Sequence, residues 1–385
     1  MGNSYGKKKY ILYYRIISYI LKTRYKKAID LRKVLFMDLR SAWLTINRNC
    51  NLKCSWCYAK DVSSKINNEM KVEIAKELID ISLSVGIKDF KLIGGEPTLH
   101  TGLFEILRYL IKNNCKIVIV TNGIILKNKQ FCNQINELNY DKIYFGISLK
   151  GSSDEEYLQN CGSNAFASVI KGIRNCDEMG LNYSLSYVLT VDNVKYLDIF
   201  AKRIKDCNIN KPITFSFCND AISSDDKKYS CKQHPLVIDS IFAQKYPSVN
   251  FIFNNKLFLH QSLPLCMCNQ ELLKKMKEKN QVATSCHVHR RSGVIFDIDG
   301  SILLCNHLAG FSIGKFKQDY WDGKSFADFW ESEYMIGLYK KFTSMPSLEC
   351  MECSSSTECG GGCCIQWFFH DFESYKNYKR KENGL

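Results

Sequence analysis

Short β-rich runs alternate with helical segments over residues 41–217, and this alternation constrains the fold more than any other feature of the sequence. Between the runs, segments 69–85, 102–113, 166–179 and 193–206 carry apolar residues at three- and four-residue spacing, which is typical of amphipathic helices. The six β-rich runs are 41–47, 89–94, 116–121, 142–149, 182–189 and 213–217. Strand and helix in repeated alternation predict a parallel sheet with right-handed crossovers. Since a closed barrel needs eight units, we expect an α/β fold, a partial (β/α)6 TIM-like barrel with its functional loops at the carboxyl ends of the strands.

Changes in composition divide the 385 residues into five predicted segments. A barrel-sized core with an appended module fits this length. We expect a basic N-terminal extension (1–40), a barrel core (41–220), a polar, irregular linker (221–263), a small cysteine-rich C-terminal domain (264–370) and a tail (371–385).

The net charge of +14 is concentrated partly in the first forty residues. This segment is either a solvated helical extension or a surface for an acidic partner, nucleic acid or a membrane.

The chain has no run of eighteen apolar residues and no recognisable secretory signal, so we expect a soluble cytoplasmic protein. In a reducing compartment, nineteen cysteines indicate metal or cluster ligation rather than disulfides.

Three cysteines, Cys50, Cys54 and Cys57, directly follow the first predicted strand. A structural zinc site would require four ligands, usually as two Cys-x2-Cys pairs. Three thiolates on one short loop instead suit a four-iron cluster in which one iron has no protein ligand.

The pattern Cys-x3-Cys-x-aromatic-Cys, with Trp56 as the aromatic residue, resembles the signature of the radical S-adenosylmethionine (SAM) enzymes. The resemblance implies a 4Fe-4S cluster whose open iron is chelated by SAM. It also implies reductive cleavage of SAM to methionine and a 5′-deoxyadenosyl radical, with electrons from a low-potential donor such as flavodoxin or ferredoxin.

Further motifs stand at the ends of the next strands. In Gly94-Gly95-Glu96, the glycines allow close approach of the backbone to a ligand, and Glu96 offers a carboxylate to an ammonium group. By resemblance, this motif holds the methionyl amine of SAM. Asn122 lies in a Thr-Asn-Gly turn of the kind found in the family, and Ser148 stands where relatives contact the SAM ribose or carboxylate.

Lys150 departs from the family pattern, because many relatives carry an aspartate at this position. The departure leaves open what residue 150 contacts.

The C-terminal cysteines form a second pattern. Cys286 is followed by Gly300 and Cys305, and the next four cysteines spell Cys-x2-Cys-x5-Cys-x3-Cys; they are Cys350, Cys353, Cys359 and Cys363. This resembles the SPASM extension of radical SAM enzymes, which binds two auxiliary 4Fe-4S clusters. One or two zinc sites are the alternative, since Cys-x2-Cys pairs bind zinc readily.

The resemblance assigns these cysteines to two clusters. The first would use Cys286, Cys305 and Cys363 with one upstream cysteine, Cys266 in preference to Cys268. The second would use Cys350, Cys353 and Cys359. Its fourth ligand is Cys364, or else it has an open iron or is absent.

The surroundings of these cysteines support rigid placement. Residues 296–305 contain Asp-Gly and predict a hairpin that puts Cys305 on a strand. We expect His287 and His289 to form hydrogen bonds beside Cys286 rather than to act as ligands. The cysteines without ligand spacing are expected to be small buried apolar residues; they are Cys115, Cys132, Cys161, Cys176, Cys207, Cys218 and Cys231.

The architecture implied by the resemblance modifies peptides or proteins, and we expect a maturase of ribosomal peptides that forms thioether or carbon–carbon crosslinks. Alternatives are a sulfatase-maturase-like enzyme, an RNA-modifying radical SAM enzyme, and a zinc or electron-transfer scaffold. Sulfatase-maturing relatives carry an aspartate base where this chain has Asn306, which disfavours that alternative.

Only about forty residues precede the first predicted strand, whereas many peptide maturases begin with a leader-binding domain. A peptide leader would be held by the basic segment or by a separate protein. The sequence identifies no catalytic acid or base.

Overall fold

The computed structural model describes the barrel and most of the C-terminal region. The described residues are 38–59, 69–190, 192–218, 256–257, 264–267, 273–274, 277–278, 286–309, 311–365, 367 and 372. The predicted extension, linker and tail lie almost entirely outside these ranges, as do Cys231 and Cys268.

One curved ten-stranded sheet organises the fold, in the order β10-β9-β8-β1-β2-β3-β4-β5-β6-β7. Neighbours from β1 to β7 pair in parallel, as the strand–helix alternation predicts. The strands are β1 (Ser41–Asn47), β2 (Asp89–Gly94), β3 (Lys116–Thr121), β4 (Ile143–Leu149), β5 (Asn182–Leu189), β6 (Ile213–Phe217), β7 (Lys256–Leu257), β8 (Gly293–Phe296), β9 (Ile302–Leu303) and β10 (Ser312–Gly314). The predicted partial barrel is therefore confirmed.

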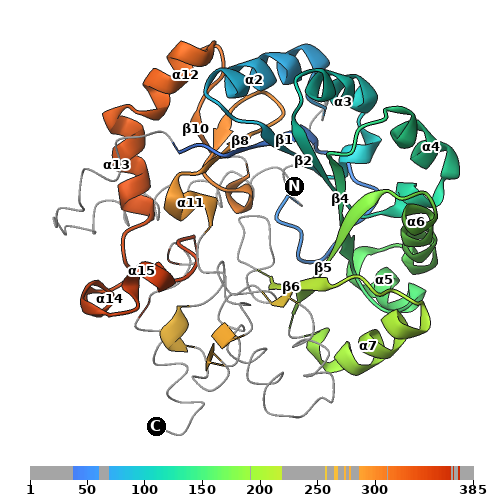
Figure 1. The fold of residues 1–385 in the computed structure, drawn as a ribbon. Helices are drawn as coiled ribbons and strands as arrows, with labels where there is room; N and C mark the ends of the chain where they lie inside the picture. Colours follow the sequence, from blue (N-terminus) through green and yellow to red (C-terminus); the bar gives the residue numbers. More distant parts are fainter. Residues whose placement is uncertain are drawn as a thin grey trace, which may run out of the picture.

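Helices cover the outer side of the curved sheet (Figure 1). Those of the barrel are α2 (Val72–Ser84), α3 (Leu103–Lys112), α4 (Lys129–Glu137), α5 (Asp154–Cys161), α6 (Phe166–Glu178) and α7 (Leu197–Asp206). The short 3-10 turns are η2 (Pro97–Leu99), η3 (Ile124–Lys127), η4 (Val194–Tyr196), η6 (Leu265–Met267) and η7 (Asn306–Leu308). Helices α11 (His287–Arg290), α12 (Gly323–Trp330), α13 (Glu333–Phe342), α14 (Leu348–Glu352) and α15 (Ser356–Cys359) belong to the C-terminal region.

Helices α4 and α5 were not predicted, although both begin at capping residues. The Asn128 side chain accepts a hydrogen bond from the Gln130 amide, and the Ser153 hydroxyl accepts one from Glu156. Side chains of this kind satisfy the free N–H groups of a first helical turn. These caps were an available sequence signal for both helices, and the spacing of Phe131, Cys132 and Ile135 was a second one for α4.

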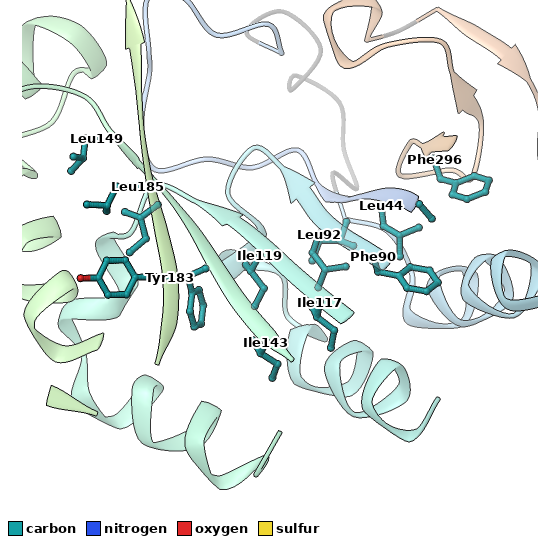
Figure 2. Packing of buried hydrophobic residues seen from close by; sticks show 14 of the residues in the cluster. Leu44, Phe90, Leu92, Ile117, Ile119, Ile143, Leu149, Tyr183, Leu185 and Phe296 are labelled. Atoms are coloured by element: carbon teal, nitrogen blue, oxygen red, sulfur yellow. The ribbon is translucent and has the colours of Figure 1, made fainter. Parts of the chain in front are cut away.

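The barrel core lies between the sheet and its helices. Leu44, Leu92 and Ile119 are fully buried on successive strands, and Figure 2 shows them in a row across these strands, with Ile117 and Ile143 below. Helix α3 buries Leu103, Ile106, Leu107 and Leu110, whose spacing of three and four residues places them on one face. The alternation along the strands and the three- and four-residue spacing along α3 thus place apolar side chains of both in the layer between the sheet and the helices.

The C-terminal region extends the barrel sheet instead of standing apart from it. Strand β8 pairs in parallel with β1, and β8 and β9 form the expected antiparallel hairpin, with Gly300 in the left-handed region at φ +81°. Cys305 is not on a strand, however, because β9 ends at Leu303 and Cys305 precedes the turn η7. The prediction for Cys305 was wrong since the antiparallel pairing is only two residues long.

A continuous apolar cluster joins the two halves of the molecule. It contains strand residues of the barrel together with Phe326, Trp330 and Tyr339 from α12 and α13. Lys317 also forms an ion pair with Glu77 on α2. Among the described residues, no helix is long and apolar enough to span a membrane.

Candidate functional site

The three-cysteine loop follows β1 and is held against the end of α5. The Lys53 amide donates a hydrogen bond to the carbonyl oxygen of Cys161 over 2.8 Å, and the Ser55 amide donates to that of Asn160 over 3.0 Å. Within the loop, the Cys57 amide donates to the Cys54 carbonyl over 3.1 Å. These backbone contacts fix the path of the segment that carries Cys50, Cys54 and Cys57.

Backbone amides also point at the thiols. The Leu52 amide lies 3.4 Å from Cys50 Sγ, and the Ala59 amide lies 3.4 Å from Cys57 Sγ. Such donors favour the thiolate form, which is the form that ligates metals. Burial opposes them, because it raises the pKa of Cys50 to about 11 and also raises the pKa of Cys57.

Cys54 has the opposite balance. The neighbouring Cys161 thiol and the positive charge of Lys150 both lower the pKa of Cys54, and together they outweigh the effect of burial and bring it to about 6. Cys161 was predicted only to be a buried apolar residue, and it is fully buried. Its contact with the loop depends on how α5 packs, which no spacing in the sequence reveals.

Gly94 and Gly95 pack against the backbone of the three-cysteine loop. The Gly95 amide donates to the Asn47 carbonyl over 2.6 Å, and the Glu96 amide donates to that of Asn49 over 2.7 Å. A Cβ at Gly95 would come within 2.6 Å of the Arg48 carbonyl oxygen and nearer still to that of Asn49. The close approach expected of these glycines is therefore made to the neighbouring loop.

The Glu96 carboxylate is buried and bonded within the protein. It accepts hydrogen bonds from the hydroxyls of Thr98 (2.6 Å) and Thr121 (2.7 Å) and from the amides of Asn122 (2.8 Å) and Thr98 (3.2 Å). Burial raises its pKa, and the hydrogen bonds counteract that effect. Glu96 thus ties the ends of β2 and β3 together, and a role toward the amine of SAM remains a prediction.

The other predicted SAM contacts surround the same loop. Asn122 Nδ2 donates to Asn51 Oδ1 over 2.7 Å, and Trp56 is buried against Cys54, Val188 and Cys218. Lys150 Nζ lies 5.9 Å from the centroid of the Trp56 ring.

Ser148 lies farther along the same edge of the sheet. Its Oγ is 3.3 Å from that of Ser186 on β5. The ends of β1 to β5 therefore bring the predicted residues to one edge of the sheet, as parallel strands require.

A buried ion pair connects this loop to the C-terminal hairpin. Arg48 forms hydrogen bonds to Asp297 Oδ1 from Nη2 (2.5 Å) and Nε (3.1 Å), and the Arg48 side chain is only 2% exposed. Beside it, the rings of Tyr58 and His307 lie 5.4 Å apart. Neither contact could be predicted from the sequence, because 249 residues separate the partners of each pair.

A pocket of about 250 Å³ lies in the C-terminal region, and the described residues that line it include four cysteines, Cys266, Cys350, Cys353 and Cys359. We refer to it as the second cysteine site. The pKa of Cys266 is raised by burial and by the charges of the other three thiols. The sequence-based grouping placed Cys266 with Cys286, whereas the structure places it in one pocket with Cys350, Cys353 and Cys359.

The remaining predicted ligands form a separate group, here the first cysteine site. The charges of Cys363 and Cys286 act on Cys305, and those of all three act on the buried thiol of Cys364. Cys364 was offered as a ligand of the second cluster, whereas the charges that act on its thiol are those of the first group. The backbone turn at Gly360–Gly362 separates Cys359 from Cys363 and explains the division.

The hydrogen bond expected of His289 is confirmed, since His289 bonds to the Gly362 carbonyl over 3.0 Å. The ring of His287 lies 5.7 Å from that of Trp43, and a hydrogen bond from His287 stays a prediction. Among the described cysteines without ligand spacing, all are buried; they are Cys115, Cys132, Cys161, Cys176, Cys207 and Cys218.

The donor sets of these sites consist of thiols. The cysteines of the second cysteine site line one pocket, and four thiolates are the usual ligand set of a four-iron cluster. The three-cysteine loop offers three thiols with amides directed at two of them, which fits a cluster with one open iron.

Comparison with known proteins identifies the barrel. Residues 44–204 match the sequence profile of the Radical SAM superfamily. The barrel is a radical SAM domain. This family uses a 4Fe-4S cluster and SAM, and the matched segment contains the three-cysteine loop and every predicted SAM contact. The protein is accordingly an enzyme.

Curated relatives of the radical SAM domain have different names. The Fe-coproporphyrin III synthase of Methanosarcina barkeri is 31% identical over 150 residues, which are 39% of this chain and 37% of that protein. A probable GTP 3′,8-cyclase of Methanococcus maripaludis is 30% identical over 183 residues, 47% of this chain and 55% of the cyclase. The chain thus spans less than two thirds of the length of either relative.

Solved structures share the fold over most of the chain. Native anSMEcpe with bound AdoMet aligns with a TM-score of 0.59 at 18% identity, over 89% of this chain and 99% of that one. Streptococcus suis SuiB bound to the precursor peptide SuiA aligns with a TM-score of 0.60 at 12% identity, over 92% and 83%. At these identities the likeness shows the fold alone.

Proposed function

We propose that this protein is a radical SAM enzyme that cleaves SAM reductively and modifies a peptide or protein, with auxiliary clusters at its two C-terminal cysteine sites. The observation that carries the proposal is the three-cysteine loop packed against Gly95 and Glu96 at the carboxyl end of the sheet. When bound, the cluster supplies the electron that cleaves SAM to methionine and a 5′-deoxyadenosyl radical.

The residues of the chain would hold and shield that chemistry. Cys50, Cys54 and Cys57 would ligate three irons, and the contacts between Gly95, Glu96 and the loop backbone keep these thiols in register with the second strand. Trp56, Asn122 and Ser148 would line the SAM site. Because Trp56 is buried against Val188, it also excludes water from one side of the loop.

Support for a peptide substrate comes from the fold. The chain aligns over about nine tenths of its length with two proteins that were crystallised with peptides, anSMEcpe with Kp18Cys peptide and SuiB with its precursor SuiA. The relatives named as cyclase and heme-related synthase align over less than half of the chain. The broader alignments cover far more of the chain than the barrel alone, which favours peptide maturation such as thioether or carbon–carbon crosslinking.

The first experiment tests SAM cleavage. The protein is reconstituted anaerobically with iron and sulfide, reduced with dithionite in the presence of SAM, and assayed for 5′-deoxyadenosine by chromatography. Cys54→Ala is expected to abolish the product, because it removes one of three iron ligands. Cys115→Ala, which removes a buried cysteine on the barrel, should retain the wild-type rate. Product that survives in Cys54→Ala would contradict the proposal.

A second experiment tests the substrate class. The reduced enzyme and SAM are incubated with the short peptide encoded nearest to its gene, and the peptide is analysed by mass spectrometry. A loss of two hydrogens per crosslink is expected, with the deuterium of labelled peptide recovered in 5′-deoxyadenosine. Salt-sensitive RNA binding together with RNA modification would instead support the RNA-modifying alternative.

A further inference from the structure

The structure assigns Cys266 as the fourth ligand of the second cysteine site, together with Cys350, Cys353 and Cys359. The second auxiliary cluster is then closed by a cysteine that precedes its other ligands in the sequence. The inference rests on the proposed function only in taking the bound group to be an iron–sulfur cluster.

The first argument is the composition of the pocket. Among the described residues, four cysteines line a space of about 250 Å³, and most of the other lining side chains are apolar or small, such as Leu265, Leu273 and Met345. Four thiolates complete the ligand set of a four-iron cluster. In the part of the lining that the structure describes, there is no carboxylate, and Lys277 is the one charged side chain.

The second argument is how Cys266 is held in place. The Leu265 amide donates a hydrogen bond to Cys359 Sγ over 3.2 Å, so the residue before Cys266 already contacts a ligand of the site. Farther along, Lys277 Nζ forms an ion pair with Glu358 over 2.8 Å. Leu265 is 4% exposed and anchors the turn η6 in the core. Contacts on both sides of Cys266 therefore dock its segment onto α15.

The third argument is the position of Cys364. Its thiol is buried and is influenced by Cys363, Cys286 and Cys305, which form the first cysteine site. Gly360, Gly361 and Gly362 all have positive φ, between +60° and +79°, and they turn the chain between the two sites. The Trp367 indole and His289 hold this turn through the carbonyls of Gly361 and Gly362. The thiols that act on Cys364 are thus those of the first site.

The test measures cluster content and spectra instead of activity. The parent is the full chain with Cys50, Cys54 and Cys57 replaced by alanine, so that only the C-terminal sites bind iron. After anaerobic reconstitution, iron and sulfide are counted per chain, and the reduced and mildly oxidised forms are examined by EPR and Mössbauer spectroscopy.

In this background, Cys266→Ala and Cys350→Ala should behave alike. Each is expected to lose about four irons, or to keep a cluster that releases one iron on mild oxidation and gives the EPR signal of a three-iron cluster. The double variant should lose no more than either single variant, since both cysteines serve one cluster. Cys268→Ala and Cys115→Ala should match the parent.

Several results would overturn the assignment. Cys266→Ala could retain the iron and spectra of the parent, Cys268→Ala could reproduce the loss, or the double variant could lose the iron of two clusters. A parent that binds no iron would also overturn it, while leaving the SAM-cleavage assay on the wild-type chain unaffected. If Cys266→Ala is insoluble, Cys266→Ser tests the same point, because an oxygen ligand changes the spectrum of only one cluster.

Discussion

Lys150 is the residue of the candidate site whose chemistry departs most from the pattern of its family. Its ammonium group lies 5.9 Å from the centroid of the Trp56 ring, and its charge lowers the pKa of both Cys54 and Cys57. A cation at this position stabilises thiolates and, by the same Coulomb attraction, stabilises a reduced cluster more than an oxidised one.

Replacement of Lys150 should therefore change the reduction potential of the SAM cluster. We expect Lys150→Met to lower the midpoint potential by roughly tens of millivolts, because one nearby positive charge is lost while the aliphatic stem is retained. The measurement is an EPR-monitored redox titration without SAM. Lys195→Met, which removes an exposed charge elsewhere on the barrel, is the control and should leave the potential unchanged. An unchanged or higher potential in Lys150→Met would contradict the prediction.

The ion pair between Arg48 and Asp297 shows that a buried charge requires a partner of opposite charge. Breaking a buried pair usually costs more than the pair contributes, because the remaining charge is left without compensation. Arg48 has that compensation in two hydrogen bonds to one oxygen of Asp297. Its position beside the cysteine loop therefore depends on the hairpin between β8 and β9.

At the scale of elements, the site is built by loops that contact one another at the strand ends. The loop after β1 is bonded to the loop after β2 through Gly95 and Glu96, and the latter is bonded to the loop after β3 through Thr121 and Asn122. Each loop positions the next, so a change in one element propagates along the edge of the sheet.

Gly95 tests this arrangement. We expect Gly95→Ala to lower the free energy of unfolding by about 1–3 kcal/mol, because its Cβ would overlap backbone carbonyls that cannot move independently of β1. Gly337→Ala is the matched control. Gly337 lies in α13 with open space around it, so alanine should stabilise the protein by about 0.5–1 kcal/mol.

The measurement is guanidinium denaturation of both variants without cluster, followed by circular dichroism. Equal midpoints for the two substitutions would show that the loops adjust to a side chain at residue 95.

The sequence predicted most elements of the barrel because their local patterns and their tertiary roles agree. In the strands at 41–47 and 182–189, apolar residues either alternate with polar ones or follow one another, in agreement with which positions are buried. The bounds of both strands were predicted without error. Other features depend on docking between distant segments, which leaves no local period. Two examples are the approach of Cys266 to Cys359 and the pairing of β8 with β1.

At the scale of the whole molecule, β1 is the junction between the barrel and the cysteine-rich region. It pairs with β2 on one side and with β8 on the other, and Ala42 and Leu44 within it are fully buried. The apolar cluster continues across this junction. The barrel and the C-terminal region thus share one core.

A charge at this junction should be far more damaging than the same charge at the outer edge of the sheet. Val294 lies on β8 opposite Ala42 and is 1% exposed, whereas Ser312 on β10 is exposed. We expect Val294→Asp to destabilise the protein by ~4 kcal/mol or more and to reduce its soluble yield. Ser312→Asp should change the stability by less than about 0.5 kcal/mol. Thermal unfolding and soluble yield compare the two, and similar values for both would contradict a shared core.

The pairing of β1 with β8 also has a consequence for synthesis on the ribosome. Arg48, which follows β1, and Asp297, which follows β8, are 249 residues apart. During translation, the edge of β1 that pairs with β8 therefore stays unpaired until the intervening chain has been made. At translation rates of about 5–20 residues per second, the delay is on the order of tens of seconds. If the apolar edge of β1 stays unpaired for that time, it can associate with other nascent chains. The yield of folded protein should therefore depend on how quickly residues 293–303 emerge and on which chaperones cover β1 until then.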